Sequence, residues 1–339
     1  MDVDYWKLNI NIMSFDPNKP RILVALGGRS SEREVSIESG RQVVSAMEEL
    51  GYQTAVLDTG TGKLMQTPEL DRLEKNPEKL PEVVNLPLVD IKRHFQMVFI
   101  ALHGKFGEDG GLQALLDDIG MKYTGSGPLS SALAMNKKIS KKIFAAYSVP
   151  TLPFEVISTV QKPKIKFPLV VKPNNQGSSV GVSICTNEAD FEIGAKRALE
   201  YSSEAIVEPY ITGHELTVAI LEKDNGETEA LPVIEIIPKS KFFDLKAKYD
   251  GTTEEIVPAK IDQKLAREAQ TAALKAYDAL DCRHFARVDL LVGSDNLPKV
   301  LEVNTIPGLT SESLFPKAAK VAGLDFVRLI DHLVKIALK

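Results

Sequence analysis

The first third of the chain alternates continuous apolar runs with helical patterns. Apolar residues fill 21–26 and 97–102, as in strands that are buried on both faces of a sheet. The pattern predicts strands at 21–26, 54–57 and 97–102 and helices at about 35–50 and 111–119. This alternation predicts a parallel sheet covered by helices, which binds ligands at the carboxyl ends of its strands. The polar loops 27–34 and 103–110 occupy such positions.

The remaining two thirds do not continue this alternation. A Lys-rich helical pattern over about 136–147 ends at Val149-Pro150, and shorter elements follow it. Strand patterns occur at 154–157, 169–172, 182–184, 205–208 and 215–221, with one helix between 184 and 205. Further on, the pattern predicts a strand from 228 to 237, a polar loop over 238–257, a helix over 262–280, a β-hairpin and two closing helices. We therefore expect an α/β unit followed by a distinct α+β module.

Two stretches near the carboxyl end, 285–292 and 300–304, alternate between apolar and polar residues. Successive side chains of a strand point to opposite faces, so Leu301 and Val303 are predicted to share the apolar face of the second stretch. Residues 293–296 between the two stretches read Gly-Ser-Asp-Asn, which is a turn sequence. The pattern therefore predicts an antiparallel hairpin with one polar face.

The polar face of this hairpin carries groups that can bind a metal ion. A turn centred on residues 295–296 places Asp289 opposite Glu302 and Arg287 opposite Asn304. Side chains opposite one another in a sheet lie about 5 Å apart at Cβ. Two carboxylates and an amide oxygen suit Mg²⁺ that is shared with substrate phosphates. The same pattern also fits a half-exposed hairpin with an ordinary charged face.

Composition narrows the class of protein. The 339 residues are 44% hydrophobic and 26% charged, with a net charge of −5, so the length predicts two or three domains. This mild acidity gives no basis for binding nucleic acid or an anionic membrane. Cys185 and Cys282 lie in no cysteine or histidine cluster, and two cysteines in so long a chain indicate a reducing compartment. The chain has neither a membrane-spanning apolar run nor a secretion signal, so we expect a cytoplasmic protein.

A second chemical feature lies at residues 168–182, where a strand, a small polar loop and another strand follow one another. Lys172 ends the first strand, where its ammonium could reach a phosphate. Gly177 and Gly181 in the loop would let the backbone approach phosphate oxygens. On its own this stretch also fits a plain hairpin turn. Likewise, the linker 208–215 could bind an adenine edge and a ribose, or could simply connect two domains.

Several strings of residues together resemble the D-alanine–D-alanine ligases, a family of ATP-grasp enzymes. The resemblance runs from about residue 21 to the end of the chain and leaves an N-terminal arm, residues 1–20, outside. The matching strings are Gly27-Gly28-x-Ser30-x-Glu32-Arg33-Glu34-Val35-Ser36, Ala101-Leu102-His103-Gly104, Gly107-Glu108-Asp109-Gly110, Tyr123-Thr124-Gly125-Ser126-Gly127, Lys172-Pro173, Gly177-Ser178-Ser179-Val180-Gly181 and Glu302-Val303-Asn304-Thr305-x-Pro307-Gly308-Leu309-Thr310-x-x-Ser313-Leu314.

The resemblance implies a three-domain α/β and α+β fold. A Rossmann-like domain would span 21–128, a central ATP-grasp subdomain 129–214, and a C-terminal ATP-grasp subdomain 215–339 with the loop 238–257 as its lid. The implied reaction joins two D-alanines through an acyl phosphate, at the expense of ATP, in cytoplasmic peptidoglycan synthesis. ATP and two Mg²⁺ ions, which Mn²⁺ can replace, are the implied cofactors, and a homodimer is the implied assembly.

The resemblance also implies a role for individual residues. Those implied to bind ATP are Lys137, Lys172, Gly177, Ser178, Ser179, Glu208, Pro209, Tyr210, Ile211, Glu215 and Lys248, and those implied to bind metal are Asp289, Glu302 and Asn304. For the two D-alanines the implied residues are Glu32 at the first ammonium, His103 near the first carboxylate, Arg287 and the Gly308 N–H at the oxyanion, and Ser313 with Leu314 at the second carboxylate. Ser178, Tyr249 and Glu32 would form a hydrogen-bonded bridge between domains.

The loop 238–257 and three departures from the family refine this expectation. A structureless loop of this length is usually functional, and a lid would protect an acyl phosphate from water. By resemblance Tyr249 marks a dipeptide-forming ligase, which favours an amine as the second nucleophile. Asn136 replaces the Asp that is usual in the family, with an expected effect on helix capping. Glu312 replaces a frequent His beside the second-substrate site, and residues 174–176 form a less charged loop tip than in some relatives.

Three hypotheses follow from the sequence. The first is a D-alanine–D-alanine ligase. The second is another ATP-grasp ligase that uses a different acceptor, such as D-lactate, and it would differ in the pH dependence of the acceptor reaction. The third is a nucleotide-binding protein without catalysis, which would be expected to lack a metal ligand or a phosphate-binding lysine.

Overall fold

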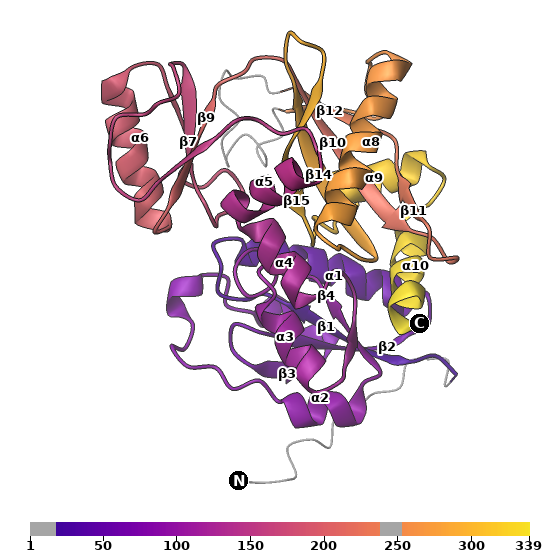
Figure 1. Cartoon of the computed structure of the whole chain (residues 1–339). Coiled ribbons are helices and arrows are strands. Elements are labelled where there is room, and N and C mark those ends of the chain that lie inside the picture. Colours follow the sequence, from indigo (N-terminus) through magenta and orange to yellow (C-terminus); the bar gives the residue numbers. More distant parts are fainter. Residues whose placement is uncertain (1–17, 238–252) are drawn as a thin grey trace.

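The computed structural model describes residues 18–237 and 253–339 and arranges them around three β-sheets (Figure 1). One sheet lies at the bottom of Figure 1, and the other two lie above it. This mixed α/β architecture confirms the predicted fold class. Within the described ranges, no helix combines the length and the apolarity needed to cross a bilayer.

The first unit contains a five-stranded sheet of order β3-β2-β1-β4-β5, in which only β3 is antiparallel to its neighbour. Its elements are β1 (Arg21–Leu26), α1 (Arg33–Glu49), β2 (Gln53–Asp58), β3 (Lys63–Met65), the 3₁₀ helices η2 (Thr67–Arg72) and η3 (Pro77–Lys79), α2 (Leu88–His94), β4 (Met97–Ile100), α3 (Gly111–Asp118) and β5 (Lys122–Tyr123). Alternate β1 residues pack against α1 on one face and against α2 and α3 on the other. Burial on both faces explains why β1 and β4 are continuously apolar.

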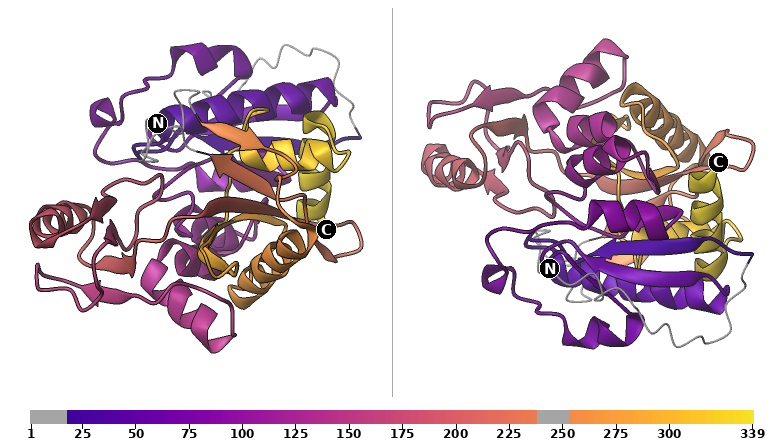
Figure 2. Two further views of the ribbon diagram at one scale, coloured as in Figure 1. Left: turned by 90° about the horizontal axis from the view of Figure 1, so that it is seen from above. Right: turned by 90° about the horizontal axis from the view of Figure 1, so that it is seen from below.

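The central unit is a small four-stranded sheet covered by one helix. Its strands are antiparallel, in the order β6-β9-β7-β8. The elements are β6 (Glu155–Ile157), β7 (Leu169–Pro173), β8 (Ser183–Cys185), α6 (Glu188–Tyr201) and β9 (Ala205–Pro209). Apolar residues of α6, among them Phe191 and Ala195, form a separate core with this sheet. The central unit therefore projects from the rest of the molecule, as the three views in Figures 1 and 2 agree.

The third unit contains the sheet β13-β12-β10-β14-β15, with β11 paired to β10. Its elements are β10 (His214–Glu222), β11 (Thr228–Ala230), β12 (Ile234–Ile237), β13 (Glu254–Ile256), α8 (Gln263–Ala279), β14 (Phe285–Val292), β15 (Pro298–Asn304), α9 (Leu314–Val321) and α10 (Phe326–Leu338). Two earlier helices, α4 (Pro128–Met135) and α5 (Lys137–Ala146), contribute Ala134 and Phe144 to the core beneath this sheet. The predicted capping role of Asn136 is confirmed, because its side chain accepts a hydrogen bond from Ile139 N at 3.1 Å.

Two sequence-based predictions in this unit are wrong. The strand predicted over 228–237 is interrupted between β11 and β12 by Leu231-Pro232-Val233. Proline has no backbone N–H to donate to a neighbouring strand, which explains the break. The loop predicted over 238–257 is not irregular throughout, because residues 254–256 form β13 and pair with β12.

The first and third units share one core. Buried residues of β1 and α1, such as Val24 and Met47, cluster with Leu329 and Leu333 of α10. The Tyr52 hydroxyl reinforces this contact by donating a hydrogen bond to Asp331 Oδ1 at 2.7 Å. The C-terminal helix thus completes the apolar covering of the N-terminal sheet.

A half-buried histidine, His284, lies where the first and third units join. Gly125 N donates to His284 Nδ1 at 3.1 Å, and His284 N donates to Glu222 Oε2 at 2.9 Å. Burial, with a smaller contribution from the positive charge of Arg283, lowers the pKa of His284 to about 4. The imidazole is therefore neutral at physiological pH, as its role of hydrogen-bond acceptor requires.

We expect this histidine to make the fold sensitive to acid. A folded-state pKa of about 4, below the unfolded value of about 6.5, means that the unfolded chain takes up the proton first. Through this group the free energy of unfolding is therefore highest above pH 6.5, and it falls by up to about 3 kcal/mol as the pH drops toward 4. His284→Asn keeps an acceptor atom and tolerates the positive φ of 64°. Urea unfolding at pH 5 and pH 7.5 should give a smaller difference for His284→Asn than for the parent chain; equal differences would contradict the assignment.

Candidate active site

The predicted register of the β14–β15 hairpin is confirmed. Asp289 pairs with Glu302 and Arg287 pairs with Asn304 across the two antiparallel strands. The register shifts by one residue after Asp289, so that Leu290 faces Val300 and one residue of β15 bulges out. The bulge interrupts the predicted alternation, because Val300 and Val303 are buried in the core whereas Leu301 is only half-buried.

Asp289 is held by hydrogen bonds from two sides. Arg287 donates from Nε to Asp289 Oδ1 and from Nη2 to Oδ2, both at 2.9 Å. Thr217 on β10 lies opposite Asp289 and donates from Oγ1 to Oδ1 at 2.5 Å. Burial alone would lower the pKa of Arg287, but the carboxylates of Asp289 and, more weakly, Glu302 outweigh it and raise that pKa. Arg287 is therefore a fixed positive charge beside the two acids.

Glu302 is paired with the predicted phosphate-binding lysine of α5. Lys137 Nζ lies 3.0 Å from Glu302 Oε2 and donates a hydrogen bond to the backbone oxygen of Gln176 at 2.7 Å. Lys137 is only 6% exposed. The contact brings α5, the hairpin and the loop after β7 to one point.

A second pair of lysines surrounds Glu208 at the end of β9. Lys172 Nζ lies 2.6 Å from Glu208 Oε2, and Lys141 contacts the other oxygen of this buried carboxylate. Burial opposes ionisation of Glu208, yet the two ammonium groups lower its pKa, and Glu208 in turn raises the pKa of Lys172 despite burial. Lys141, which also donates to Thr151 Oγ1 at 2.7 Å, was missed in the sequence. Its position four residues after Lys137, on the same face of a helix, is a signal that could have identified it.

The linker between β9 and β10 passes over the hairpin turn. A Cβ on Gly213 would lie 1.8 Å from the backbone oxygen of Val292, and one on Gly293 would lie 2.7 Å from Ile211 Cγ2. Two glycines therefore allow this close approach. Glu215 follows on β10, two residues before Thr217, and so lies on the same face of the sheet. The predicted adenine and ribose residues thus adjoin the predicted metal residues.

The loop between β7 and β8 has unusual backbone geometry. Ser178, Ser179 and Gly181 all have positive φ, at 50°, 58° and 72°. A Cβ on Gly181 would lie 2.8 Å from Pro173 Cγ, so a side chain there would displace the proline ring, and the approach of this backbone to phosphate stays a prediction. At Gly177 the nearest atom, Glu32 Oε2, would lie 3.7 Å away, so this loop position does not require glycine.

Two residues of the predicted interdomain bridge are in contact. The Ser178 hydroxyl donates a hydrogen bond to Glu32 Oε1, which joins the central unit to the first unit. Tyr249, the third predicted member, lies outside the described residues, as does Lys248, which is predicted to bind ATP. The tight loop around Gly104 lies beside the bridge, because a Cβ there would be 3.0 Å from Glu32 Oε2.

His103 is buried on the first-unit side of this contact. Its Nε2 lies 3.1 Å from Ser39 Oγ, and its Nδ1 lies 3.4 Å from Glu108 Oε1. Ser39 and Glu108 were not singled out in the sequence, although Glu108 belongs to a string that matches the family. These two partners fix the plane of the imidazole.

The loop between β15 and α9 brings two further predicted residues together. A Cβ on Gly308 would lie 2.7 Å from Ser313 Oγ, so a side chain there would displace this hydroxyl. Ser313 is the N-cap residue of α9, which begins at Leu314, and the first amides of a helix are suited to bind an anion. Lys317, one turn further along α9, lies 3.5 Å from Glu312 Oε2 and 2.9 Å from Glu255 Oε2. The ammonium of Lys317 thus neutralises the negative charge that Glu312 introduces where many relatives have His.

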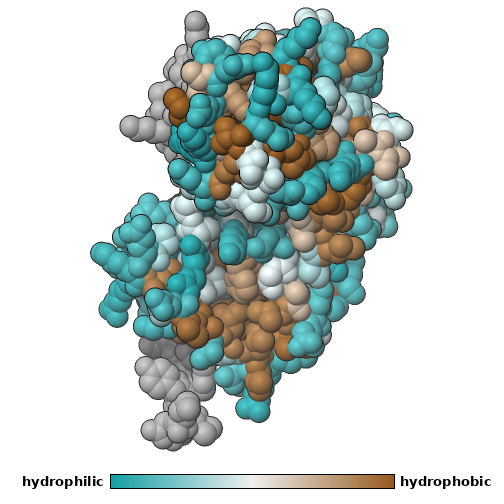
Figure 3. All heavy atoms as spheres, turned by 60° about the vertical axis from the view of Figure 1, so that its left-hand side comes forward, coloured by the Kyte–Doolittle hydropathy of each residue, from teal (hydrophilic) through white to brown (hydrophobic). Residues whose placement is uncertain are grey.

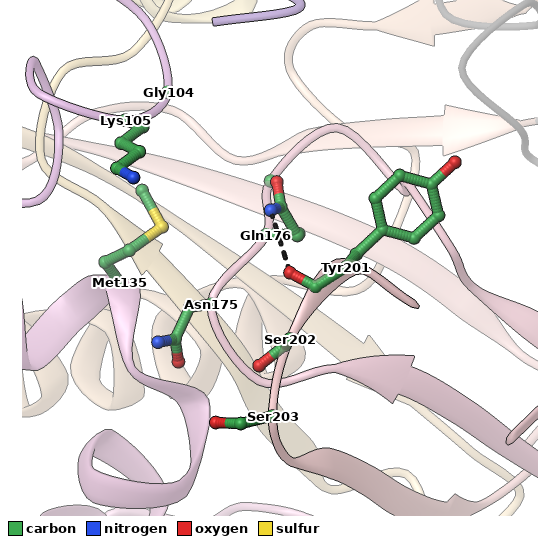
Figure 4. Close-up of a pocket in the computed structure, with 9 residues that line it drawn as sticks. Gly104, Lys105, Met135, Asn175, Gln176, Tyr201, Ser202 and Ser203 are labelled. Carbon is green, nitrogen blue, oxygen red and sulfur yellow. Dashed lines mark hydrogen bonds between the residues drawn. The ribbon is translucent and has the colours of Figure 1, made fainter. Parts of the chain in front are cut away.

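A cavity of about 220 Å³ lies beside the bridge between the first and central units (Figure 4). Gly104 and Lys105 line it from the first unit, and residues 175–177 and 201–203 line it from the central unit. Within the central unit, Gln176 Nε2 donates to the backbone oxygen of Tyr201 at 3.4 Å beside this cavity. Figure 3 shows an indentation between the two units on this side of the molecule. The polar contact of Ser178 with Glu32 joins the two units next to it.

Cys185 and Cys282 are both free thiols. Burial raises their pKa to about 11 and about 12, respectively. A protonated thiol is a poor nucleophile, so neither residue is suited to covalent catalysis.

Comparisons with known proteins agree with this arrangement. Residues 21–126 match the model of the D-ala D-ala ligase N-terminus, and residues 144–335 match the model of the D-ala D-ala ligase C-terminus. The chain is 38% identical over 333 residues to the D-alanine–D-alanine ligase of Pelotomaculum thermopropionicum, covering 94% of this chain and 97% of that relative. It is also 38% identical over 328 residues to D-alanine–D-alanine ligase A of Clostridium perfringens, covering 94% and 98%.

Solved structures give the same picture. The D-alanine–D-alanine ligase of Bacillus anthracis complexed with ATP has a TM-score of 0.76 and 31% identity, and the match covers 94% of this chain and 97% of that one. The VanG D-Ala:D-Ser ligase of Enterococcus faecalis has a TM-score of 0.79 and 29% identity, and covers 94% and 100%. The similarity therefore extends through all three units.

Proposed function

The chain belongs to the D-alanine–D-alanine ligase family, and we propose that Asp289, Glu302 and Asn304 hold the metal ions with which it uses ATP. Its activity is the ATP-dependent ligation of D-alanine to D-alanine, a step of peptidoglycan synthesis. The observation that carries the proposed metal site is the register that sets Asp289 opposite Glu302.

The residues on this face fit Mg²⁺. Two carboxylates and the Asn304 amide oxygen are hard donors of the kind that hold Mg²⁺ together with phosphates, and Mn²⁺ accepts the same ligands. Arg287 pairs with Asp289 and Lys137 pairs with Glu302, so a cation lies beside each of the two acids. When bound, two Mg²⁺ ions would neutralise the charge on the γ-phosphoryl group during its transfer.

The nucleotide is proposed to lie across β7, β9 and β10. Lys137 and Lys172 would bind its phosphates, with the backbone of Gly177, Ser178 and Ser179 closing over them. Glu208, Pro209, Tyr210 and Ile211 would line the adenine, and Glu215 would bind the ribose hydroxyls. Support comes from the contacts of Lys137 and Lys172 with acids at the same junction, since a triphosphate could replace those acids as the partner of each ammonium.

The first chemical step is proposed to be phosphoryl transfer. Glu32 would bind the ammonium of the first D-alanine, and His103 would lie near its carboxylate. A carboxylate oxygen attacks the γ-phosphorus in line, the bond to the β-phosphate oxygen breaks, and ADP leaves. The product is a D-alanyl acyl phosphate, which carries the leaving group that a free carboxylate lacks.

The second step is proposed to be attack by an amine. Ser313 and the backbone of Leu314 would hold the carboxylate of the second D-alanine. Its neutral amine attacks the acyl carbon, and Arg287 with the Gly308 N–H stabilises the resulting oxyanion. Phosphate then leaves, and the amine gives up a proton as the peptide bond forms.

One assay tests this assignment. Purified protein with ATP and Mg²⁺ should release phosphate with D-alanine and not with L-alanine, and mass spectrometry should find the dipeptide. D-lactate and D-serine serve as competing acceptors between pH 6 and pH 9. We expect D-alanine to be preferred over D-lactate increasingly as the pH rises, because the amine of D-alanine must lose a proton before it attacks. D-serine must lose the same proton, so its comparison with D-alanine should depend little on pH. Faster product formation with D-lactate or D-serine throughout this range would reassign the second substrate.

Three further expectations remain proposals. We propose that the domains span 21–128, 129–214 and 215–339, that the protein assembles as a homodimer, and that it is located in the cytoplasm. ATP as a substrate and the two free thiols favour a cytoplasmic location. Light scattering coupled to size exclusion would test the dimer, which predicts twice the chain mass of 37.2 kDa.

A further inference from the structure

Thr217 is a buried residue of the predicted metal-binding face with no role assigned above. It lies on β10, where it pairs with Asp289 of β14, and its side chain is 0% exposed. Its Oγ1 lies 2.5 Å from Asp289 Oδ1 and 3.3 Å from the backbone oxygen of Val288, and its single hydroxyl hydrogen serves these two acceptors. The shorter contact is with the carboxylate, so the hydroxyl donates chiefly to Asp289.

Thr217 and Glu302 lie on opposite sides of Asp289. Asp289 pairs with Thr217 on β10 in one direction and with Glu302 on β15 in the other. One row across three strands therefore reads hydroxyl donor, carboxylate, carboxylate. Thr217 therefore holds Oδ1 of Asp289 from the β10 side, while Arg287 donates to both oxygens from within β14.

We propose that Thr217 is a positioning residue that orients Asp289 for a divalent cation shared with Glu302. This inference depends on the proposed metal site. Arg287 also holds Asp289, but the same guanidinium is proposed to stabilise the oxyanion and so has a second partner during the reaction. Thr217 contacts no proposed substrate group, and its hydrogen bond to Asp289 can persist throughout the cycle.

The local structure suits this role. Thr217 is β-branched, which restricts its first side-chain torsion, and it lies inside a long central strand. Its methyl group is held by complete burial, so its hydroxyl has little freedom to leave Asp289. Residues that hydrogen-bond a metal ligand typically contribute 10–100-fold to metal affinity.

Three variants, compared with the parent chain, separate the hydroxyl from the packing. Thr217→Val keeps the shape and removes the donor, whereas Thr217→Ser keeps the donor. The parent chain and Thr217→Val form one pair that differs in the hydroxyl, and Thr217→Ser and Thr217→Ala form a second such pair. The readout is the binding of Mn²⁺ to the full-length protein saturated with ADP, measured by electron paramagnetic resonance. The melting temperature of each protein without added metal is measured alongside.

We expect Thr217→Val and Thr217→Ala to bind Mn²⁺ about 10–100-fold more weakly than their hydroxyl-bearing counterparts. Raising Mg²⁺ should restore most of the turnover of Thr217→Val. Equal Mn²⁺ affinity within each pair would overturn the positioning role, as would a loss in Thr217→Ser as large as that in Thr217→Val. If Thr217→Val does not fold, the Ser and Ala pair decides the question.

Asp289→Asn distinguishes failure of this inference from failure of the metal site. It should lose Mn²⁺ binding whatever Thr217 does. Parent-like Mn²⁺ binding by Asp289→Asn would overturn the proposed metal site itself, and with it the role of Thr217.

Discussion

Replacing Glu302 by alanine is expected to lower turnover by about a thousandfold or more while the protein stays folded. Glu302 faces Asp289 across the hairpin, and its loss removes one of the two carboxylates proposed to hold the metal ions. A thousandfold corresponds to about 4 kcal/mol, which lies within the several kcal/mol that a bound metal contributes to phosphoryl transfer. Phosphate release at saturating D-alanine measures the effect, and circular dichroism with thermal unfolding reports the fold.

The pairing of Glu302 with Lys137 suggests a companion variant. Alanine leaves the 6% exposed Lys137 without this carboxylate, whereas Glu302→Gln keeps an oxygen that can accept from the ammonium. Glu302→Gln should therefore melt closer to the parent protein and still turn over poorly, because it lacks the ligand charge. Glu227→Ala in the exposed turn between β10 and β11 is the matched control. Near-normal turnover in a well-folded Glu302→Ala would refute the metal assignment.

The second large effect is expected from Arg287→Lys, which should lower kcat by about 100- to 1,000-fold. The guanidinium donates to both oxygens of Asp289 at 2.9 Å, and lysine keeps the charge but has one ammonium in place of a planar fork. A single donor group cannot hold Asp289 at both oxygens and also reach the oxyanion. At saturating Mg²⁺ the KM for ATP should change less than kcat, because Arg287 is not among the proposed nucleotide-binding residues and Thr217 still donates to Asp289. Steady-state kinetics with ATP and D-alanine varied separately give both constants.

Arg283→Lys controls for the loss of an arginine near the start of the same strand. Arg283 lies at the junction with the first unit, where it donates to the backbone oxygen of Gly125 at 3.0 Å. Its replacement should affect stability slightly and leave kcat near that of the parent. A comparable loss of kcat in both arginine variants would mean that the effect of Arg287→Lys is structural.

The hairpin register was predictable because two independent signals agree. The turn at 293–296 sets where the strands meet, and the alternation sets which face is polar. The bulge at Leu301 was not predictable, because it has no signal in composition. Without it, the pairing of Leu290 with Val300 would place Asp289 opposite Leu301 and not opposite Glu302. The strand over 228–237 was predicted wrongly because its apolar residues were given more weight than Pro232.

The contacts between units were beyond pattern analysis. Ser178 meets Glu32 although 146 residues separate them, and Gly125 meets His284 across 159 residues. No periodicity links such positions, and only the family resemblance proposed the contact of Ser178 with Glu32. Thr217 is an intermediate case, because strand alternation places it on the face of Glu215 but its partner depends on the register of a distant strand.

The shared core of α1 and α10 has a consequence for biosynthesis. The N-terminal sheet leaves the ribosome before the other two units, but Leu329 and Leu333, which cover one of its faces, belong to α10 and are made after both of them. During translation the apolar side of α1 is therefore uncovered until α10 emerges, and contacts so distant in sequence form slowly. A nascent chain stalled before α10 would present that surface to chaperones, and deletion of α10 would leave the N-terminal sheet prone to aggregate.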